Sequence, residues 1–284
     1  MYTWKSRYLT RGEVWYDDEP GDTRSVDWIH YRQRSSPFPG ARWKYFDNYF
    51  VDLTQGTEQL SEQLNKDTAY KIRRARDRDQ IVCEGCDPRD PEVLDKFEEV
   101  YNPFAATKGL SRLDRAQIDS MAAAGVLDLS VAKDPNGTAL VCHANYRDHR
   151  RATQMHSPSL YWKLSDSAAR NTIGRANRYL MWSDMLRYKE QGLKCFDFGG
   201  WYSGTTDQAL LKINEFKKGF GGQVVREYVC EQILTLKGWL VLNIARLLKQ
   251  AKLPRSGSDA PVAPPQAVEV QPPAALMLRN GVPE

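Results

Sequence analysis

The stretch from Gly192 to Gly222 constrains the fold of this chain more than any other part. It reads GLKCFDFGGWYSGTTDQALLKINEFKKGFGG. The apolar run 193–198 predicts a short strand that ends at Gly199-Gly200, and a helix is expected from about Thr206 to the glycines near 219. A strand, a glycine break, a helix and a second glycine break together indicate a ligand crevice at the end of an open sheet.

Lys217 breaks the pattern of the expected helix. At 100° per residue, Leu210, Ile213 and Phe216 share one face, and Lys217 lies between Leu210 and Ile213. Two interpretations follow. The lysine acts electrostatically on a reacting group in a partly dry site, or its stem covers the core while its ammonium reaches water near the helix C-terminus.

The composition limits the ligands and the cellular compartment that we expect for this chain. The chain has 284 residues and a formal net charge of +4, from 40 Lys and Arg against 36 Asp and Glu. This net charge is too small to indicate nucleic-acid binding by itself, and it suits an anionic substrate equally well; DNA is not expected as a partner. Five cysteines, an odd number, without a secretion signal indicate reduced thiols and a cytoplasmic protein. The pair Cys83 and Cys86 has no second pair with metal-ligand spacing, so no metal site is expected.

The first part of the chain is predicted to be β-rich. Strands are expected at 13–16, 26–32 and 43–53, where aromatic and β-branched residues alternate. A helix is expected over 57–79, with a strongly basic second half that includes Lys71, Arg73 and Arg74.

The order of elements after residue 80 predicts the fold class. A strand at 81–84 precedes a helix that starts at Asp90-Pro91 and a shorter helix that starts at Ser111. Three strands follow in a meander over 127–157, then a helix from about Gly174 to Lys189, the strand and helix of the opening stretch, a strand at 223–229 and a helix at 231–252. This order predicts an α/β fold with a mixed sheet. The Pro- and Ala-rich residues 253–284 are expected to be a disordered tail.

Three motifs resemble the Fem-type aminoacyltransferases of peptidoglycan bridge synthesis and their single-domain CelD/BioF-type relatives, within the GNAT acyltransferase fold. The motifs are Lys66-Asp67-Thr68 with 72–75, the stretch from Gly174 to Trp182 with 196–200, and Phe216-Lys217-Lys218-Gly219-Phe220-Gly221-Gly222. The resemblance covers roughly residues 43–229.

The resemblance implies a domain organisation. Residues 57–252 would be a GNAT-like acyltransferase domain, and residues 1–56 a β-rich remnant of a first, reduced domain. The bridge-forming enzymes carry two such domains in tandem, so their acceptor site does not transfer directly to this chain.

The resemblance also implies where the chemistry occurs. Phe216-Lys217 match a Phe-Lys pair implicated in the transfer step. In the family, a helix start holds the pyrophosphate of coenzyme A, because free N–H groups at a helix start bind anions. The corresponding residues of this chain are Gly174, Arg175, Ala176 and Asn177. The alternative for these four residues is an ordinary helix start.

Further candidates come from their positions near the crevice. Asp197 accepts a proton or holds an acceptor ammonium, or else caps the Gly199-Gly200 turn. His156 is the best-placed base and Tyr202 a proton donor, although either could be structural. Trp201 is a candidate for substrate binding. Lys71, Arg73 and Arg74 would bind phosphates of the substrate, or they form a solvated helix face.

The sequence therefore predicts an enzyme that transfers an acyl group from a coenzyme A thioester to an amine, on an amino sugar or a cell-envelope precursor. An aminoacyl-tRNA donor is the first alternative. A non-catalytic module that associates with nucleotides or membranes is the second. The amphipathic helix expected at 231–252 either packs on the sheet or makes a peripheral membrane contact with a lipid-linked acceptor.

Overall fold

The computed structural model describes residues 1–163 and 166–251, without the side chains of residues 245–251. The chain forms two compact units, residues 1–243 and a second unit that begins at Ile244. The tail expected at 253–284 lies outside the described residues. Among the helices that are described, none has both the length and the apolar character needed to span a bilayer.

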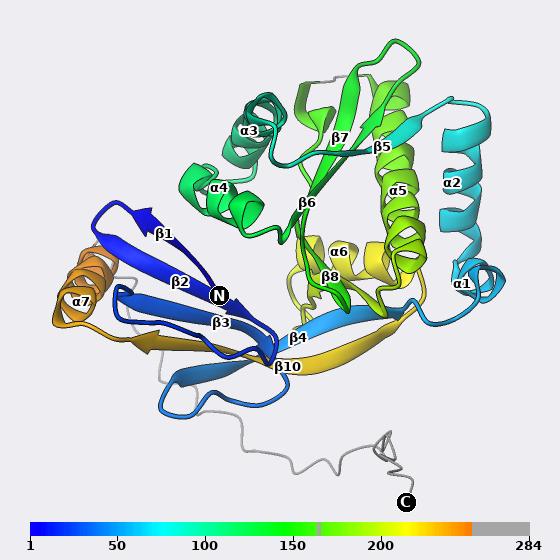
Figure 1. Cartoon of the computed structure of the whole chain (residues 1–284). Coiled ribbons are helices and arrows are strands. Elements are labelled where there is room, and N and C mark those ends of the chain that lie inside the picture. The colour runs from blue at the N-terminus through cyan, green and yellow to red at the C-terminus, as the bar shows by residue number, and fades with distance from the viewer. Residues whose placement is uncertain (164–165, 252–284) are drawn as a thin grey trace, which may run out of the picture. The chain divides into compact units, whose positions relative to one another are not determined.

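The first unit is organised around one large mixed sheet (Figure 1). Its strands run in the spatial order β1-β2-β3-β10-β4-β9-β8-β7-β6-β5. Neighbouring strands are antiparallel except for the parallel pairs β2–β3 and β8–β9. The strands are β1 (Tyr2–Ser6), β2 (Leu9–Trp15), β3 (Trp28–Arg34), β4 (Arg42–Asp52), β5 (Val82–Cys86), β6 (Leu127–Lys133), β7 (Ala139–Arg147), β8 (Arg151–His156), β9 (Cys195–Gly200) and β10 (Gln223–Ile233).

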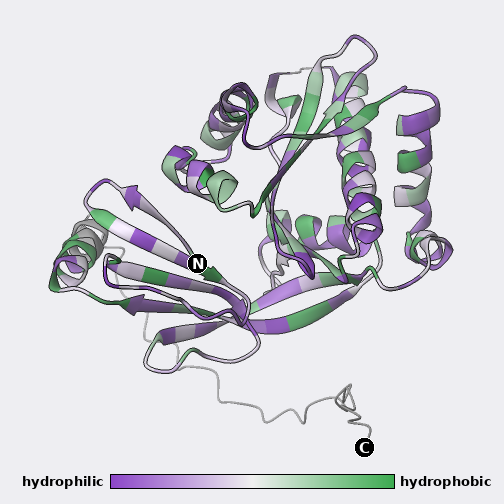
Figure 2. Ribbon diagram, viewed as in Figure 1, coloured by the Kyte–Doolittle hydropathy of each residue, from purple (hydrophilic) through white to green (hydrophobic). Residues whose placement is uncertain are grey.

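Helices cover both faces of the half of the sheet that contains β5 to β8. The pair α3 and α4 lies on one face, and α2 and α5 lie on the other (Figure 1). Figure 2 shows β6 and β7, which lie between these layers, as mainly hydrophobic. The helices are α1 (Thr57–Gln63), α2 (Lys66–Asp77), α3 (Pro91–Thr107), α4 (Arg115–Ala123), α5 (Ser167–Glu190), α6 (Gln208–Lys218) and α7 (Leu236–Ala251), with a short 3₁₀ helix at Leu160–Lys163.

The N-terminal strands belong to the same sheet as the predicted acyltransferase region. Strand β4 lies between β9 and β10, with Phe50 opposite Asp197 and opposite Gln223. Strand β3 pairs with the other edge of β10. Residues 1–56 therefore supply a central strand to the sheet that holds the candidate site, while the division into domains at 56/57 stays a prediction.

The predicted meander is confirmed as β6, β7 and β8. Its first turn has Gly137 in the left-handed region at φ +82°. The Asp134 carboxylate accepts hydrogen bonds from the backbone N–H groups of Asn136 and Thr138. The carboxylate therefore satisfies N–H groups that have no backbone partner in the turn. This explains why the Asp-Pro-Asn-Gly sequence forms a hairpin turn.

Two of the predicted helix boundaries are wrong in the first half of the chain. The helix expected over 57–79 is two helices, because Asn65 leaves the helical conformation and its side chain caps α2 by accepting the N–H of Thr68. The helix expected from Ser111 begins at Arg115, where Asp114 provides the cap.

Two boundaries are also wrong in the second half. Helix α5 begins at Ser167, not at Gly174, because the Asp166 carboxylate caps it through the N–H of Ala169. The helix expected from residue 231 begins at Leu236, because β10 keeps pairing with β3 as far as Ile233.

Gly222 offers a test of how closely β4 and β10 approach. It has φ +112°, and a Cβ built on it would lie 2.2 Å from the carbonyl oxygen of Phe50. Gly137 also has positive φ, but a Cβ there would meet nothing within 4 Å. We expect Gly137→Ala to cost about 1 kcal/mol and Gly222→Ala about 3 kcal/mol or more. Chemical denaturation of both variants measures the difference, and equal losses would contradict this account.

Candidate active site

The end of β9 is built around the peptide groups of Gly199 and Gly200. Gly199 has φ +71°, and its N–H donates to the Asp197 carboxylate at 2.7 Å. A Cβ at Gly199 would lie 3.2 Å from the carbonyl oxygen of Gln154 on β8. Both the backbone conformation and the close approach of β8 therefore require glycine at this position. Asp197 caps the Gly199-Gly200 turn, which is the second of the two roles considered for it.

Lys217 reaches the same turn from α6. Its Nζ donates to the carbonyl oxygens of Gly199, at 3.1 Å, and Gly200, at 2.5 Å. The residue is only 7% exposed, so the ammonium does not extend into water. Burial lowers the pKa of Lys217 to about 8, and the negative charge of Asp197 opposes this shift. An ammonium has three N–H donors, so one remains beyond the two carbonyls.

The burial pattern of α6 differs from the one expected. Asn214 and Lys217 are the buried residues of this helix, whereas Leu210 is 38% and Ile213 48% exposed. The predicted inward apolar stripe is therefore wrong, because polar side chains of α6 serve the β9 turn and the following loop. Two large apolar side chains are left facing solvent beside the candidate site.

Phe216 and Lys217 point to different neighbours. The Phe216 ring lies 4.9 Å from the guanidinium carbon of Arg178 on α5 and 5.4 Å from the Phe220 ring. Since successive helical residues are 100° apart, Phe216 packs towards α5 while Lys217 reaches β9.

The loop after β9 is held against α6 and β4. The Asn214 side chain accepts the N–H of Tyr202 and donates to its carbonyl oxygen. Trp201 stacks on Tyr49 of β4, with ring centroids 5.1 Å apart. The Tyr202 hydroxyl lies 3.3 Å from the Thr206 hydroxyl, and this hydrogen bond lowers the pKa of Tyr202. The structure therefore places Asp197, Trp201 and Tyr202 at or directly after the turn that Lys217 reaches.

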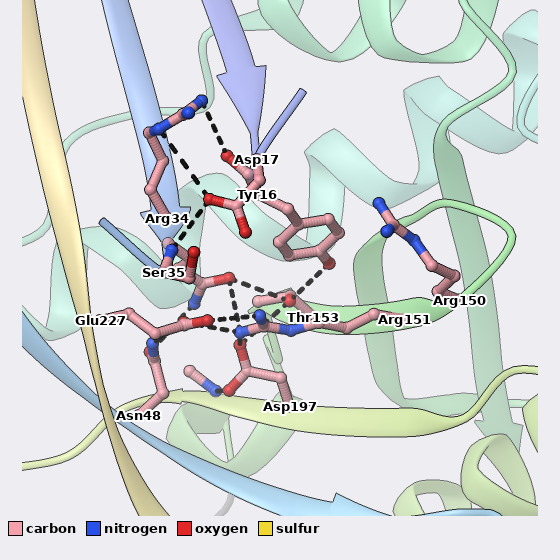
Figure 3. Close-up of polar contacts among 12 residues, drawn as sticks. Tyr16, Asp17, Arg34, Ser35, Asn48, Arg150, Arg151, Thr153, Asp197 and Glu227 are labelled. Carbon is pink, nitrogen blue, oxygen red and sulfur yellow. Dashed lines mark hydrogen bonds and ion pairs between the residues drawn. The ribbon is translucent and has the colours of Figure 1, made fainter. Parts of the chain in front are cut away.

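A buried polar network continues from Asp197 towards the N-terminal strands (Figure 3). Arg151 at the start of β8 donates to Asp197 at 2.6 Å and to Glu227 of β10 at 2.7 Å. Thr153 donates to Asp197 at 3.0 Å, and Asn48 of β4 donates to Glu227 at 2.6 Å. The network therefore ties β4, β8, β9 and β10 together beside the candidate site.

The N-terminal strands complete this network. Gln33 of β3 accepts from Arg151 and donates to Asn48, and its Oε1 lies 3.1 Å from the Thr153 hydroxyl oxygen. The Tyr16 hydroxyl lies 2.9 Å from that of Thr153, and its ring lies 4.4 Å from the guanidinium carbon of Arg151. Sequence reasoning missed Arg151 and Glu227, because only the strand pairing shows that a turn arginine and an alternating strand glutamate meet.

Glu227 is the carboxylic acid of this network whose pKa is raised. Burial raises the pKa of Glu227 to about 7, although the hydrogen bond and charge of Arg151 act in the opposite direction. The network places two carboxylates on a single guanidinium, so a proton on Glu227 balances the buried charge.

The His156 ring contacts α3 and not the Lys217 side chain. Its ring packs against Tyr101 of α3 with centroids 4.8 Å apart, and burial lowers the pKa of His156 to about 4. The imidazole is neutral at pH 7, yet this pKa makes it a weak general base. Within the described residues it makes no hydrogen bond to Lys217 or Asp197.

The four residues predicted to hold a pyrophosphate lie inside α5. In a helix interior the N–H of Gly174 is used by the helix itself, so the predicted anion site at a helix start does not exist there. Arg175 pairs with Asp79, and Ala176 is in the core. The Asn177 side chain is hydrogen-bonded to His143 and accepts from the Ser157 hydroxyl. The true start of α5 is already capped by the Asp166 carboxylate.

The basic residues of α2 do not join the Lys217 turn. Lys71 pairs with Asp67 at 2.7 Å, Arg74 donates to the Tyr70 hydroxyl, and Arg73 is exposed. Only the N-terminal end of α2 meets the glycine motif, where the N–H of Asn65 donates to the carbonyl oxygen of Gly219.

The network gives a pH-dependent stability that Glu227→Gln should remove. The folded chain holds the extra proton between pH 4.5 and about 7, so wild-type stability falls as the pH rises through that window. Between pH 5 and pH 8 we expect the wild type to lose roughly 2 kcal/mol relative to Glu227→Gln. Denaturant titrations at both pH values measure this. Glu215→Gln, at an exposed glutamate of α6, is the control, and parallel curves for wild type and Glu227→Gln would refute the expectation.

Comparison with solved structures identifies the fold. The chain is similar to FemX, with a TM-score of 0.59, 12% identity and 85% of each chain covered. It is also similar to the C-terminal domain of a protein from Agrobacterium fabrum described as a lysylphosphatidylglycerol synthetase, with a TM-score of 0.50, 17% identity and coverage of 87% of this chain and 84% of that one. L-PGS from Bacillus licheniformis gives a TM-score of 0.51, 15% identity and coverage of 86% and 84%.

No family model and no curated protein sequence matches the chain. At identities of 12 to 17% the likeness to these structures concerns the fold alone. The expectation of a mixed sheet with a Fem-type fold is confirmed: the chain has the fold of FemX, of the domain from Agrobacterium fabrum and of L-PGS.

Proposed function

We propose that this protein is an acyltransferase that moves an acyl or aminoacyl group to an amine, with Lys217 at the transfer centre. The observation that carries the proposal is the buried ammonium of Lys217, fixed by the carbonyl oxygens of Gly199 and Gly200 at the end of β9. A buried cation without a carboxylate in contact is costly, and such groups concentrate at sites where charge develops during a reaction.

The geometry suits stabilisation of an oxyanion. The acceptor amine attacks the acyl carbonyl, a C–N bond forms, and negative charge develops on the carbonyl oxygen. The remaining N–H of Lys217 donates to that oxygen. The ammonium does not have to reorient during the reaction, because the two glycine carbonyls already hold it in place. As the intermediate collapses, the bond from the acyl carbon to the donor breaks, and the proton of the amine passes to the leaving group. Tyr202 is the proton donor that we propose in the loop, and Asp197 acts by holding the turn.

The donor we favour is an aminoacyl-tRNA, the first alternative to the acyl-CoA donor predicted from the sequence. The proposed coenzyme A site required a helix start at Gly174, whereas α5 starts at Ser167 with a carboxylate at its cap. A carboxylate at this position competes with a pyrophosphate for the same N–H groups. Support for aminoacyl transfer comes from the likeness to FemX and to lysylphosphatidylglycerol synthetases over more than four-fifths of the chain.

The acceptor we propose is an amine on a cell-envelope precursor, either an amino sugar or a lipid-linked molecule. Support for a contact with a lipid surface comes from α7, where Leu236, Trp239 and Leu240 are exposed. Tryptophan and leucine on one face of a helix are typical of segments that lie in a membrane interface. The cytoplasmic location stays a prediction, as does the non-catalytic module that the sequence leaves as a rival.

Lys217→Met tests the transfer centre. Methionine keeps the length and apolar stem but removes the donors, so we expect the variant to fold and to lose about 100-fold or more in transfer rate. Wild-type transfer should also decline as the pH rises through about 8, because the ammonium loses its proton. Lys218→Met is the matched control, since Lys218 is exposed and pairs with Glu215. Full activity of a folded Lys217→Met protein would eliminate the proposal.

The donor is tested by offering the purified protein two labelled donors, acetyl-CoA and total tRNA charged with amino acids, together with amine acceptors such as a glucosamine-bearing nucleotide sugar and an amine-free control sugar. We expect transfer from charged tRNA that ribonuclease abolishes. Ribonuclease-resistant transfer from acetyl-CoA would restore the first prediction from the sequence. Binding of neither donor would favour the non-catalytic module.

A further inference from the structure

A small cavity is lined by residues of the N-terminal strands and α4, and none of these residues belongs to the turn that Lys217 contacts. Its volume is about 70 Å³, and Arg11 and Glu13 of β2, Trp28, His30 and Arg32 of β3 form most of its wall. Gln117 of α4 closes the opposite side. A volume of this size holds several atoms of a ligand but not a nucleotide or a sugar ring.

Three side-chain nitrogens in the cavity wall are buried without a hydrogen-bond partner in the described part of the chain. They are Nε of Arg11, Nε1 of Trp28 and Nε2 of His30. Glu231 does not satisfy the histidine, because its Oε1 lies 3.9 Å from Nε2. Each buried donor without a partner costs about 1–3 kcal/mol, so three around one cavity indicate an occupant that accepts hydrogen bonds.

The charges in the wall favour an anion as this occupant. Glu13 is already occupied, since it accepts from Arg32 at 3.0 Å, Trp15 at 2.8 Å, the Tyr2 hydroxyl and Gln117. Its charge therefore offsets that of Arg32. The guanidinium of Arg11 lies over the Trp28 ring at 5.0 Å and has no carboxylate within ion-pair distance among residues 1–163 and 166–251.

The donors also favour one chemical class of anion. Arginine and tryptophan nitrogens only donate, and an ionised carboxylate only accepts. Arginine matches the planar geometry of a carboxylate, and this group fits the volume. Burial and the charges of Arg32 and Arg11 lower the pKa of His30 to about 3, so the ring is neutral and its Nε2 can carry the donated hydrogen.

We propose that this cavity is a carboxylate-binding site in which Arg11, Trp28 and His30 hold the two oxygens. The carboxylate belongs either to a small free acid or to the end of a longer molecule, such as a peptide. Nothing in this proposal requires the transfer chemistry assigned to Lys217, so the two can be tested independently.

The indole N–H of Trp28 provides a direct probe. In a ¹H–¹⁵N spectrum of the full-length protein, the signal of Trp28 is identified by its loss in Trp28→Phe, which keeps an aromatic ring under Arg11. We expect acetate to shift this signal saturably, and Arg11→Gln to weaken acetate binding at least tenfold. Arg7→Gln, at an exposed arginine in the turn before β2, is the control that should leave binding unchanged.

The titration distinguishes the two possible sources of the carboxylate from each other and from other occupants of the cavity. Saturation by acetate alone indicates a free small acid, and saturation by both acetate and N-acetylglycine indicates a carboxylate on a longer molecule. Absence of a saturable shift, or an unchanged shift in Arg11→Gln, would overturn the proposal and leave water as the occupant. Equal binding of chloride or phosphate would also overturn it, because the cavity would then be a general anion site.

Discussion

The candidate site depends on one buried guanidinium. Arg151 connects Asp197, which fixes the Gly199 turn, with Glu227 and through it with Asn48. Removing one partner of such a buried ion pair usually costs about 3–5 kcal/mol, because the other charge remains without compensation. The intact network adds little net stability, because the desolvation of its charges offsets their attraction. Its main effect is to fix how the N-terminal strands meet the end of β9.

The peptide of Gly199 links this network to the proposed chemistry. Its N–H is held by Asp197 and its carbonyl oxygen by Lys217, so the two ends of one peptide group are fixed by opposite charges. The glycine allows the positive φ that this arrangement needs. A rigid support of this kind is what preorganised electrostatic catalysis requires, because a cation that must first be reoriented contributes less to the rate.

Local sequence signals predicted much of the fold and part of the site. Alternation and turn residues predicted the meander, and the run around Gly199 predicted the strand, the glycine turn and the helix that carries Lys217. The errors came from effects that the local pattern does not contain. Gly174 lies inside α5 and not at its start, because a helix tolerates an isolated glycine. Helix α6 buries polar Asn214, because its amide binds the backbone of the loop after β9. Arg151 and Glu227 are brought together only by strand pairing, which no short-range period encodes.

The position of β4 has a consequence for how the chain acquires its structure during synthesis. Phe50 pairs with Asp197, which leaves the ribosome about 150 residues later, a delay of roughly ten to thirty seconds at usual rates of translation. During that time a strand rich in aromatic residues has neither of its neighbours, since β9 and β10 do not yet exist. Unpaired strands of this kind recruit other chains. Arg42 and Lys44 of this strand are exposed in the folded chain, and such charges oppose pairing with other chains until the second half emerges.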